Sequence, residues 1–139
     1  MALLNVEQLQ EILVNAFPNA DVPRVEEVSG DTVLVCLPTT ERHGRPGGTI
    51  SGPTMMTLAD TAAWMAILAQ IGPVLLAVTT SLHFDFLRKP AITDLMARGR
   101  VPKLRRKLGV VDVEIFSRGE TKLVAKSQVT YSIPSTEAQ

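Results

Sequence analysis

One segment, residues 47–71, constrains the fold of this chain more than any other. It opens with glycines and reaches Pro53, which suits the first turn of a helix because its φ is fixed and its missing N–H is not needed there. Gly72 and Pro73 then end the helical pattern. Asp60 is the only charged residue between these signals. Since a helix that is apolar on nearly every face is a buried one, the sequence predicts a core helix over 53–71.

A membrane span shares this pattern, because it needs about 20 mostly apolar residues. In a span, however, the carboxylate of Asp60 would lie near the middle of the bilayer, where a charge is costly. The flanks also lack a cluster of basic residues. We therefore expect a helix inside a protein core and no membrane partner.

The rest of the chain has the pattern of strands around this helix. A first helix is predicted over about 5–17, with Asn5 as its cap. Alternating apolar residues predict strands over 22–28, 32–37, 74–87, 94–101, 108–116 and 123–133. One antiparallel sheet curled around one buried helix accounts for this order, so the expected fold class is α+β, in a single domain over 1–139. Such a sheet leaves edges and an open face, and we expect a homo-oligomer, either a dimer or a dimer of dimers (a homotetramer).

The long strand over 74–87 has two distinct faces in this prediction. Val78, Leu82 and Phe84 fall on the side that would press against the helix. Thr79 and His83 fall on the other side, toward solvent or a partner chain.

Composition excludes several classes of protein. The 14 basic residues balance the 14 acidic ones, which argues against a nucleic-acid partner. Cys36 is the single cysteine and His43 and His83 lie far apart in the chain, so no disulfide and no metal site are expected. The N-terminus lacks the basic and apolar regions of a signal peptide, which predicts a cytoplasmic protein.

A family resemblance lies in the run Gly48-Thr-Ile-Ser-Gly-Pro-Thr-Met-Met-Thr-Leu-Ala-Asp60-Thr-Ala. It is similar, without a gap, to the signature of hotdog acyl-CoA thioesterases of the phenylacetyl-CoA type. That signature reads Gly-Thr-x-His-Gly-Gly, four residues, then Leu-Ala-Asp/Glu-Thr-Ala. Weaker likenesses follow at 86–90, 124–125 and 130–131. The resemblance implies the hotdog fold, a curled antiparallel sheet wrapped around one long helix, with active sites formed between subunits.

The resemblance gives Asp60 and Gly52 the main chemical roles. In the family the carboxylate attacks the thioester or activates water, which is worth about 10² to 10⁴ in rate. The glycine N–H donates to the thioester carbonyl oxygen, helped by the positive end of the helix. Taken alone, Asp60 also fits a helix carboxylate satisfied by neighbouring donors, and Gly52 a glycine chosen for backbone freedom.

Two positions depart from the family pattern. Ser51 replaces the family histidine, and it either hydrogen-bonds to substrate, as a third candidate catalytic residue, or caps the helix. Arg45 stands where an asparagine or glutamine is common, and it either contacts a substrate anion or is a solvated loop residue. Pro53 replaces the second family glycine and cannot donate, but the proposed role needs only Gly52.

Further candidates would bind the substrate. Thr61 and Trp64 lie close to Asp60 on the predicted helix, where they line an acyl pocket or pack in the core. Four cations are candidates for the coenzyme A phosphates, with a solvated surface as the alternative: Arg88, Lys89, Arg105 and Arg106.

The function expected from this resemblance is hydrolysis of an acyl-CoA thioester to the free acid and coenzyme A. No cofactor is expected, because coenzyme A belongs to the substrate. Ser51 and Arg45 also suggest an alternative, a hotdog protein that binds acyl-CoA without turnover. A hotdog enoyl-CoA hydratase or dehydratase is a second alternative, disfavoured because the histidine that it would pair with the carboxylate is a serine here.

Overall fold

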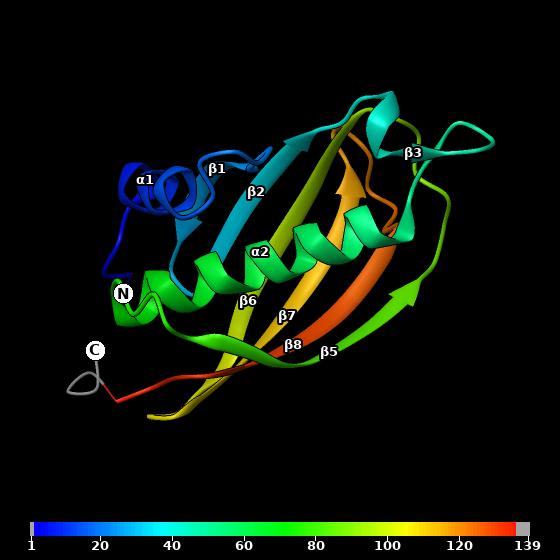
Figure 1. Cartoon of the computed structure of the whole chain (residues 1–139). Coiled ribbons are helices and arrows are strands. Elements are labelled where there is room, and N and C mark those ends of the chain that lie inside the picture. The colour runs from blue at the N-terminus through cyan, green and yellow to red at the C-terminus, as the bar shows by residue number, and fades with distance from the viewer. Residues whose placement is uncertain (1, 136–139) are drawn as a thin grey trace.

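The computed structural model describes residues 2–135 and shows one long helix lying across a curled antiparallel sheet (Figure 1). Met1 and 136–139, the ends of the predicted 1–139 domain, lie outside the described residues. The elements are α1 Val6–Ala16, β1 Arg24–Ser29, β2 Thr32–Pro38, the 3-10 turn η1 Glu41–His43, β3 Gly44–Arg45, β4 Thr49–Ile50, α2 Gly52–Ile71, β5 Val78–Phe86, β6 Asp94–Leu104, β7 Leu108–Ser117 and β8 Ala125–Ser132.

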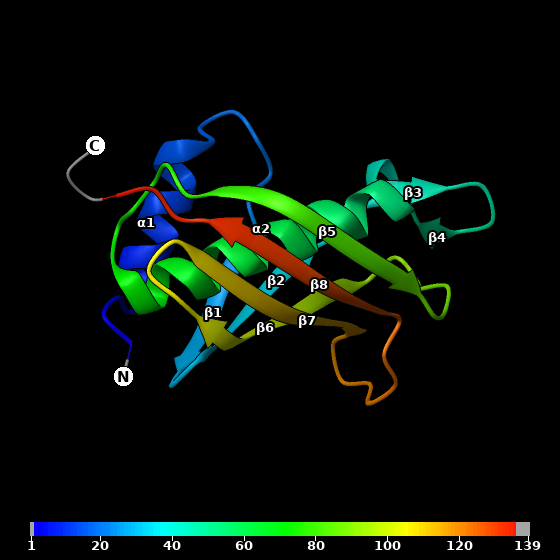
Figure 2. The same ribbon diagram turned by 90° about the horizontal axis from the view of Figure 1, so that it is seen from below.

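The strands of the main sheet lie in the order β1-β2-β6-β7-β8-β5, and all neighbours are antiparallel. α2 crosses one face of this sheet, and the opposite face carries no helix (Figure 2). β1 and β5 are the two edge strands. The arrangement confirms the predicted α+β class and the hotdog fold.

α2 is buried because its sequence gives it no polar face. Its buried side chains are mainly alanine, leucine and methionine. The helix comes close to the sheet at β6, where a Cβ on Gly99 would lie 3.1 Å from the Ala62 carbonyl oxygen. The helix ends at Gly72, whose φ of 92° is a conformation that favours glycine. None of the helices within 2–135 combines the length and apolar character needed to cross a membrane.

β5 differs from the predicted strand because of a β-bulge. The register in which β5 pairs with β8 shifts between Thr79 and Ser81. Side chains before this bulge therefore point to the face opposite the one that strict alternation with the later residues predicts. Thr79 therefore points toward α2, while Val78 is 57% exposed. The predicted orientation of these two side chains was wrong for this reason. Leu82, beyond the bulge, is half-buried against the core, as predicted.

Two strands also have limits that differ from those predicted from the sequence. β5 begins at Val78 because 74–77 form a turn in which the Ala77 N–H donates to the Val74 carbonyl at 3.2 Å. β6 continues to Leu104, past the predicted end at 101, because Pro102 sits in a bulge, where its missing N–H breaks no ladder hydrogen bond.

Candidate active site

The N-terminus of α2 is formed by the loop that precedes it. Ser51 is the N-cap: its Oγ accepts from the Thr54 N–H at 3.3 Å and lies 2.8 Å from the Thr54 hydroxyl. Gly52 is the first residue of the helix, and Pro53 follows where no N–H is required. Of the two roles that the sequence left open for Ser51, the structure shows its side chain in the capping one.

Asp60 lies two turns further along α2, in the wall of a cavity of about 390 Å³. Thr79 from β5 and Tyr131 from β8 line the same cavity, together with Phe17 at the end of α1. The sequence predicted a carboxylate enclosed in the core, but Asp60 is only half-buried. The reason is that β5 is the edge strand, so no further strand covers this side of the helix.

Two hydroxyl groups hold the Asp60 carboxylate. Thr79 Oγ1 donates to Oδ1 at 2.6 Å, and the Tyr131 hydroxyl donates to the same oxygen at 2.9 Å. The Tyr131 hydroxyl also lies 3.0 Å from the Asp60 carbonyl oxygen. No donor within residues 2–135 contacts Oδ2. One oxygen is therefore fixed, and the other keeps its lone pairs for a substrate or a water.

Tyr131 acts here as a donor that keeps its proton. Burial raises the pKa of its hydroxyl, and the nearby charge of Asp60 also raises it. Neither Tyr131 nor Thr79 is a candidate site residue from the sequence, because they are 71 and 19 residues from Asp60 in the chain. A signal was available for Tyr131, because a tyrosine on the inward face of a strand needs a partner for its hydroxyl.

The wall beside Asp60 is mainly apolar. Thr61 and Trp64, both predicted to contact substrate, line the Asp60 cavity. The Trp64 ring packs edge-on against Phe17, with centroids 5.9 Å apart. The indole N–H of Trp64 is buried and has no hydrogen-bond partner among the described residues. An apolar wall next to one reactive polar group is the usual character of a small-molecule site.

Gly52 lines a different cavity, of about 350 Å³, at the N-terminal end of α2. Phe86 lies against it, since a Cβ at Gly52 would be 3.3 Å from the ring. Arg45, Arg88 and Lys89 line this cavity too, and none of them forms an ion pair with another residue in 2–135. The structure thus brings three of the predicted substrate-binding cations next to the predicted carbonyl donor.

Asp60 and Gly52 do not share a cavity within one chain. Asp60 follows Gly52 by eight residues of helix, which is about 12 Å along the axis. Arg105 and Arg106 are placed elsewhere, in the turn between β6 and β7, where they line a cavity of about 640 Å³ with Ile71 at the C-terminal end of α2. The predicted site residues therefore fall into three groups along the helix.

The two histidines lie outside the cavities of Asp60 and Gly52. His43 Nδ1 accepts from the Thr40 N–H at 2.9 Å. His83 Nε2 is 3.1 Å from Asp85 Oδ2, on the sheet face opposite α2. Across residues 2–135, no three side chains of the metal-binding types gather closely enough to hold a metal ion.

Several known proteins resemble this chain. The family model of the thioesterase superfamily matches residues 47–124, more than half of the chain. A candidate esterase of Pseudomonas aeruginosa is 31% identical over 103 residues, which cover 73% of this chain and 75% of that protein. The crystal structure of a candidate thioesterase from Silicibacter sp. TM1040 has a TM-score of 0.88 and 38% identity, covering 97% of this chain and 95% of that one. The PaaI protein of E. coli, from the phenylacetic acid degradation operon, shares the fold with a TM-score of 0.78 and 21% identity, covering 95% and 97% of the two chains.

Proposed function

The chain belongs to the thioesterase superfamily, and within it we propose that this chain hydrolyses an acyl-CoA thioester to the free acid and coenzyme A. The proposal rests mainly on the Asp60 carboxylate. Its Oδ1 is held by two hydroxyl groups, while Oδ2 accepts no hydrogen bond from residues 2–135. A carboxylate oriented in this way beside an apolar wall has the geometry of a nucleophile or a general base.

Two routes use this free oxygen. As a nucleophile, Oδ2 attacks the thioester carbon, the C–S bond breaks, and coenzyme A leaves as a thiolate that takes a proton from water; a second water then hydrolyses the resulting anhydride. As a general base, Oδ2 takes a proton from water as the water oxygen attacks the same carbon; the C–S bond then breaks, and the departing coenzyme A sulfur receives that proton. In both routes, negative charge develops on the thioester carbonyl oxygen, which needs a donor that Asp60 does not supply.

Gly52 is the donor that we assign to this oxygen. Its N–H belongs to the first turn of α2, where no carbonyl of the helix accepts it, and the helix dipole is positive at this end. Because Gly52 and Asp60 of one chain line different cavities, the pair requires a second copy of the chain.

The edge strand β5 supports such a dimer. Val78 and Phe86, at its two ends, are 57% and 52% exposed, which favours a covered edge in the assembled protein. Antiparallel pairing of β5 with the β5 of a second copy, centred on Leu82, places the partner's Phe86 opposite Val78.

This pairing also brings the partner's Gly52 toward Asp60. Gly52 lies against Phe86 in its own chain, and Thr79, the neighbour of Val78, donates to Asp60. The N-terminus of one α2 therefore approaches the carboxylate of the other. In this arrangement each dimer has two sites, and each site takes its carboxylate and its carbonyl donor from different chains.

The cations near Gly52 suit the phosphates of coenzyme A. Arg45, Arg88 and Lys89 share the cavity of the proposed carbonyl donor, so they lie on the same side of the thioester as the leaving group. Arg105 and Arg106 are less well placed, because they lie beside the opposite end of α2.

A thiol-release assay with a panel of aliphatic and aromatic acyl-CoA esters tests the proposal. We expect turnover by the wild-type protein and a loss of about 10² to 10⁴ in kcat for Asp60→Asn. Coenzyme A should still bind to that variant in calorimetry. Asp31→Asn, in the exposed turn between β1 and β2, is the matched control and should keep full activity.

Thiol release and acyl-CoA binding, together with an assay of water addition to an enoyl-CoA, distinguish the alternative functions. Binding of acyl-CoA with no thiol release by the wild-type protein would favour a non-catalytic binding protein. Addition of water to an enoyl-CoA, with no thiol released, would favour a hydratase. Turnover by Asp60→Asn at the wild-type rate would contradict the assignment of Asp60.

A further inference from the structure

A cavity of about 330 Å³ lies between α1 and α2, on the side of the central helix that the sheet does not cover. Its walls come from the end of α1, the loop 17–23, the end of β2 and the N-terminal half of α2. Most of the lining side chains are apolar, and they include Leu13, Val22, Leu37 and Leu58. The volume falls within the roughly 300 to 1,000 Å³ of small-molecule pockets. We call this space the α1 cavity.

The α1 cavity adjoins the cavity of Asp60. Phe17 and Thr61 line both of them. The Phe17 ring packs edge-on against Trp64, which belongs to the wall of the Asp60 cavity, and Thr61 is the residue after Asp60 on α2. The two cavities therefore meet beside the Asp60 carboxylate, with Phe17 standing between them.

One face of α2 runs along both cavities. Thr54, Thr57 and Thr61 line the α1 cavity, and Thr61 and Trp64 line the Asp60 cavity. These residues are three or four positions apart, so they lie above one another on the helix. The α1 cavity extends along α2 from Thr61 back to Pro53, which is about 12 Å along the axis. A long ligand that starts at Asp60 thus has a continuous wall to follow.

The ionisable side chains in the wall of the α1 cavity, Asp21 and His43, have partners within the chain. Asp21 forms an ion pair with Arg42, and its carboxylate lies 3.7 Å from His43 Nε2. The other ring nitrogen of His43 accepts from the Thr40 N–H. Because these groups need no partner from a ligand, the cavity favours an apolar ligand over a charged one.

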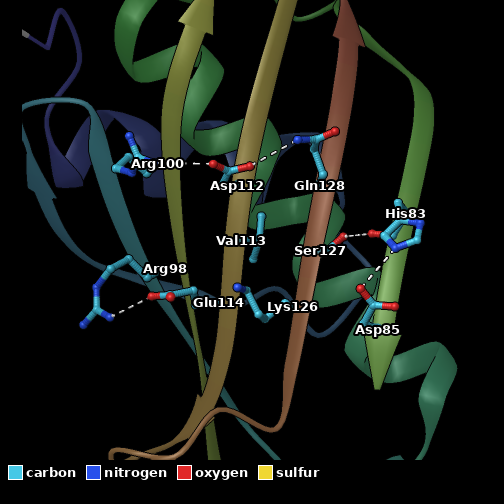
Figure 3. A pocket seen from close by; sticks show the side chains of 10 residues that line it. All are labelled: His83, Asp85, Arg98, Arg100, Asp112, Val113, Glu114, Lys126, Ser127 and Gln128. Atoms are coloured by element: carbon cyan, nitrogen blue, oxygen red, sulfur yellow. Dashed lines mark hydrogen bonds and ion pairs between the residues drawn. The ribbon is translucent and has the colours of Figure 1, made fainter. Parts of the chain in front are cut away.

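The hollow on the sheet face opposite α2 has a different chemistry (Figure 3). Its volume is about 460 Å³, but charged side chains dominate its wall, among them Arg98, Glu114 and Lys126. An apolar ligand would take water from these charges and return no hydrogen bond. The α1 cavity is the better place for an apolar group, and it is the one that adjoins Asp60.

We propose that the α1 cavity holds the tail of the acyl group, and that the substrates are coenzyme A esters of unbranched aliphatic acids. This inference rests on the proposed thioesterase function and names its substrate class. The thioester carbon lies beside Asp60, and coenzyme A extends toward Gly52 of the second copy. The acyl chain leaves the carbon in the opposite direction, passes Phe17 and enters the α1 cavity of the chain that supplies Asp60.

The length of the α1 cavity sets the length of the chain. An extended chain advances about 3.5 Å for every three bonds, so about 12 Å accommodates roughly ten bonds. Since the first carbons lie in the Asp60 cavity, a dodecanoyl chain fills both spaces. Phe17 narrows the path between them, which disfavours branched acyl groups, and an aromatic group as short as phenylacetyl does not reach the α1 cavity.

Kinetics with a series of saturated acyl-CoA esters tests this assignment. We expect kcat/KM to rise from butanoyl-CoA to dodecanoyl-CoA by up to about fourfold per methylene, because burial of one CH₂ is worth about 0.8 kcal/mol. Hexadecanoyl-CoA should show no further rise, and phenylacetyl-CoA should be a poorer substrate than dodecanoyl-CoA. Thiol release that does not depend on chain length would overturn this inference and leave the thioesterase function intact.

Thr57→Phe fills the α1 cavity from a residue that does not line the Asp60 cavity. The ratio of kcat/KM for dodecanoyl-CoA to that for butanoyl-CoA should fall by about tenfold to sixtyfold, the loss of two or three buried methylenes. Glu11→Phe adds the same ring at an exposed position of α1, outside the α1 cavity, and is the matched control. An unchanged ratio in a folded Thr57→Phe variant would contradict the inference.

Phe17→Ala gives a second test, by widening the path between the two cavities. We expect kcat/KM for a branched acyl-CoA to rise relative to that for dodecanoyl-CoA. The wild-type preference in this variant would contradict the path past Phe17.

Binding to Asp60→Asn separates this inference from the proposed function. In calorimetry, dodecanoyl-CoA should bind to this variant more tightly than butanoyl-CoA, and addition of Thr57→Phe should remove most of the difference. If the wild-type protein releases no thiol but this preference holds, the proposed function fails and the chain-binding site stands. Equal affinity for the two esters would overturn the chain-binding site, whatever the rates.

Discussion

The hydroxyl of Tyr131 lies 2.9 Å from Oδ1 of Asp60 and ties the last strand of the sheet to the central helix. Burial raises the pKa of this hydroxyl, so it remains a donor at neutral pH. Because it occupies Oδ1 and leaves Oδ2 open, Tyr131 orients the carboxylate without blocking it. We regard Tyr131 as a positioning residue rather than a reacting one.

Tyr131→Phe should lower kcat by about tenfold to a hundredfold, since a hydrogen bond to a charged group is worth roughly 1.5 to 3 kcal/mol. KM should change little, because substrate does not contact the hydroxyl in this account. Thr79→Val should act in the same direction through the same oxygen. Thiol release at saturating substrate measures both effects, with thermal unfolding as the control for a folded protein. An unchanged kcat with a raised KM would show that Tyr131 binds substrate instead.

The buried tyrosine also predicts lower stability at alkaline pH. An unfolded tyrosine ionises near pH 10, whereas burial raises the pKa of Tyr131 in the folded protein. Above about pH 10 the folded state thus keeps a proton that the unfolded state has lost, so the free energy of unfolding decreases as pH rises. The stabilisation is fully present below about pH 10 and is lost as pH rises through the folded pKa. Urea unfolding at about pH 8, 10 and 11 should show a steeper loss for wild type than for Tyr131→Phe, and equal slopes would contradict this account.

Much of the fold could be predicted from local sequence. The α2 limits follow from Pro53 and Gly72, which act on their own neighbours, and the inward face of β7 follows from strict alternation. The bulge at Thr79 could not be predicted this way. A bulge depends on how β5 pairs with β8, some fifty residues later, and the residues of β5 carry no local mark of it.

The residues of the candidate site also differ in whether local sequence could predict them. Asp60 and Gly52 belong to one continuous motif, so their residue types and spacing could be recognised together. Tyr131 reaches Asp60 only because β8 lies next to β5 beneath the helix, which is a property of the strand order. The sequence also placed Arg88 and Arg105 in one binding role, whereas the folded chain separates them along α2.

The two groups of cations predict different kinetic effects. Arg88→Gln with Lys89→Gln should raise KM about tenfold with little change in kcat, because these side chains hold the leaving group without taking part in the reaction. Arg105→Gln with Arg106→Gln removes the same amount of charge and is the matched control, for which we expect a smaller change in KM. Initial rates against acyl-CoA concentration provide both constants. A larger effect in the second pair would move the nucleotide site to the C-terminal end of α2.

Replacement of Gly52 tests its N–H directly. Gly52→Pro removes the donor at a helix position that tolerates proline, and kcat should fall by about 10² to 10³. Gly52→Ala adds a Cβ that lies 3.3 Å from the Phe86 ring but keeps the N–H, so it controls for crowding and should retain most activity. Equal losses in the two variants would assign the effect to packing rather than to the donor.

A mixed assembly of two inactive variants is the most direct measurement. Asp60→Asn and Gly52→Pro are co-expressed with different tags, and particles that contain both are purified and assayed for thiol release. A site shared between chains predicts recovery of about a quarter to a half of wild-type turnover, because the wild-type Asp60 of one chain meets the wild-type Gly52 of the other. Mixed particles as inactive as either parent would contradict the shared site.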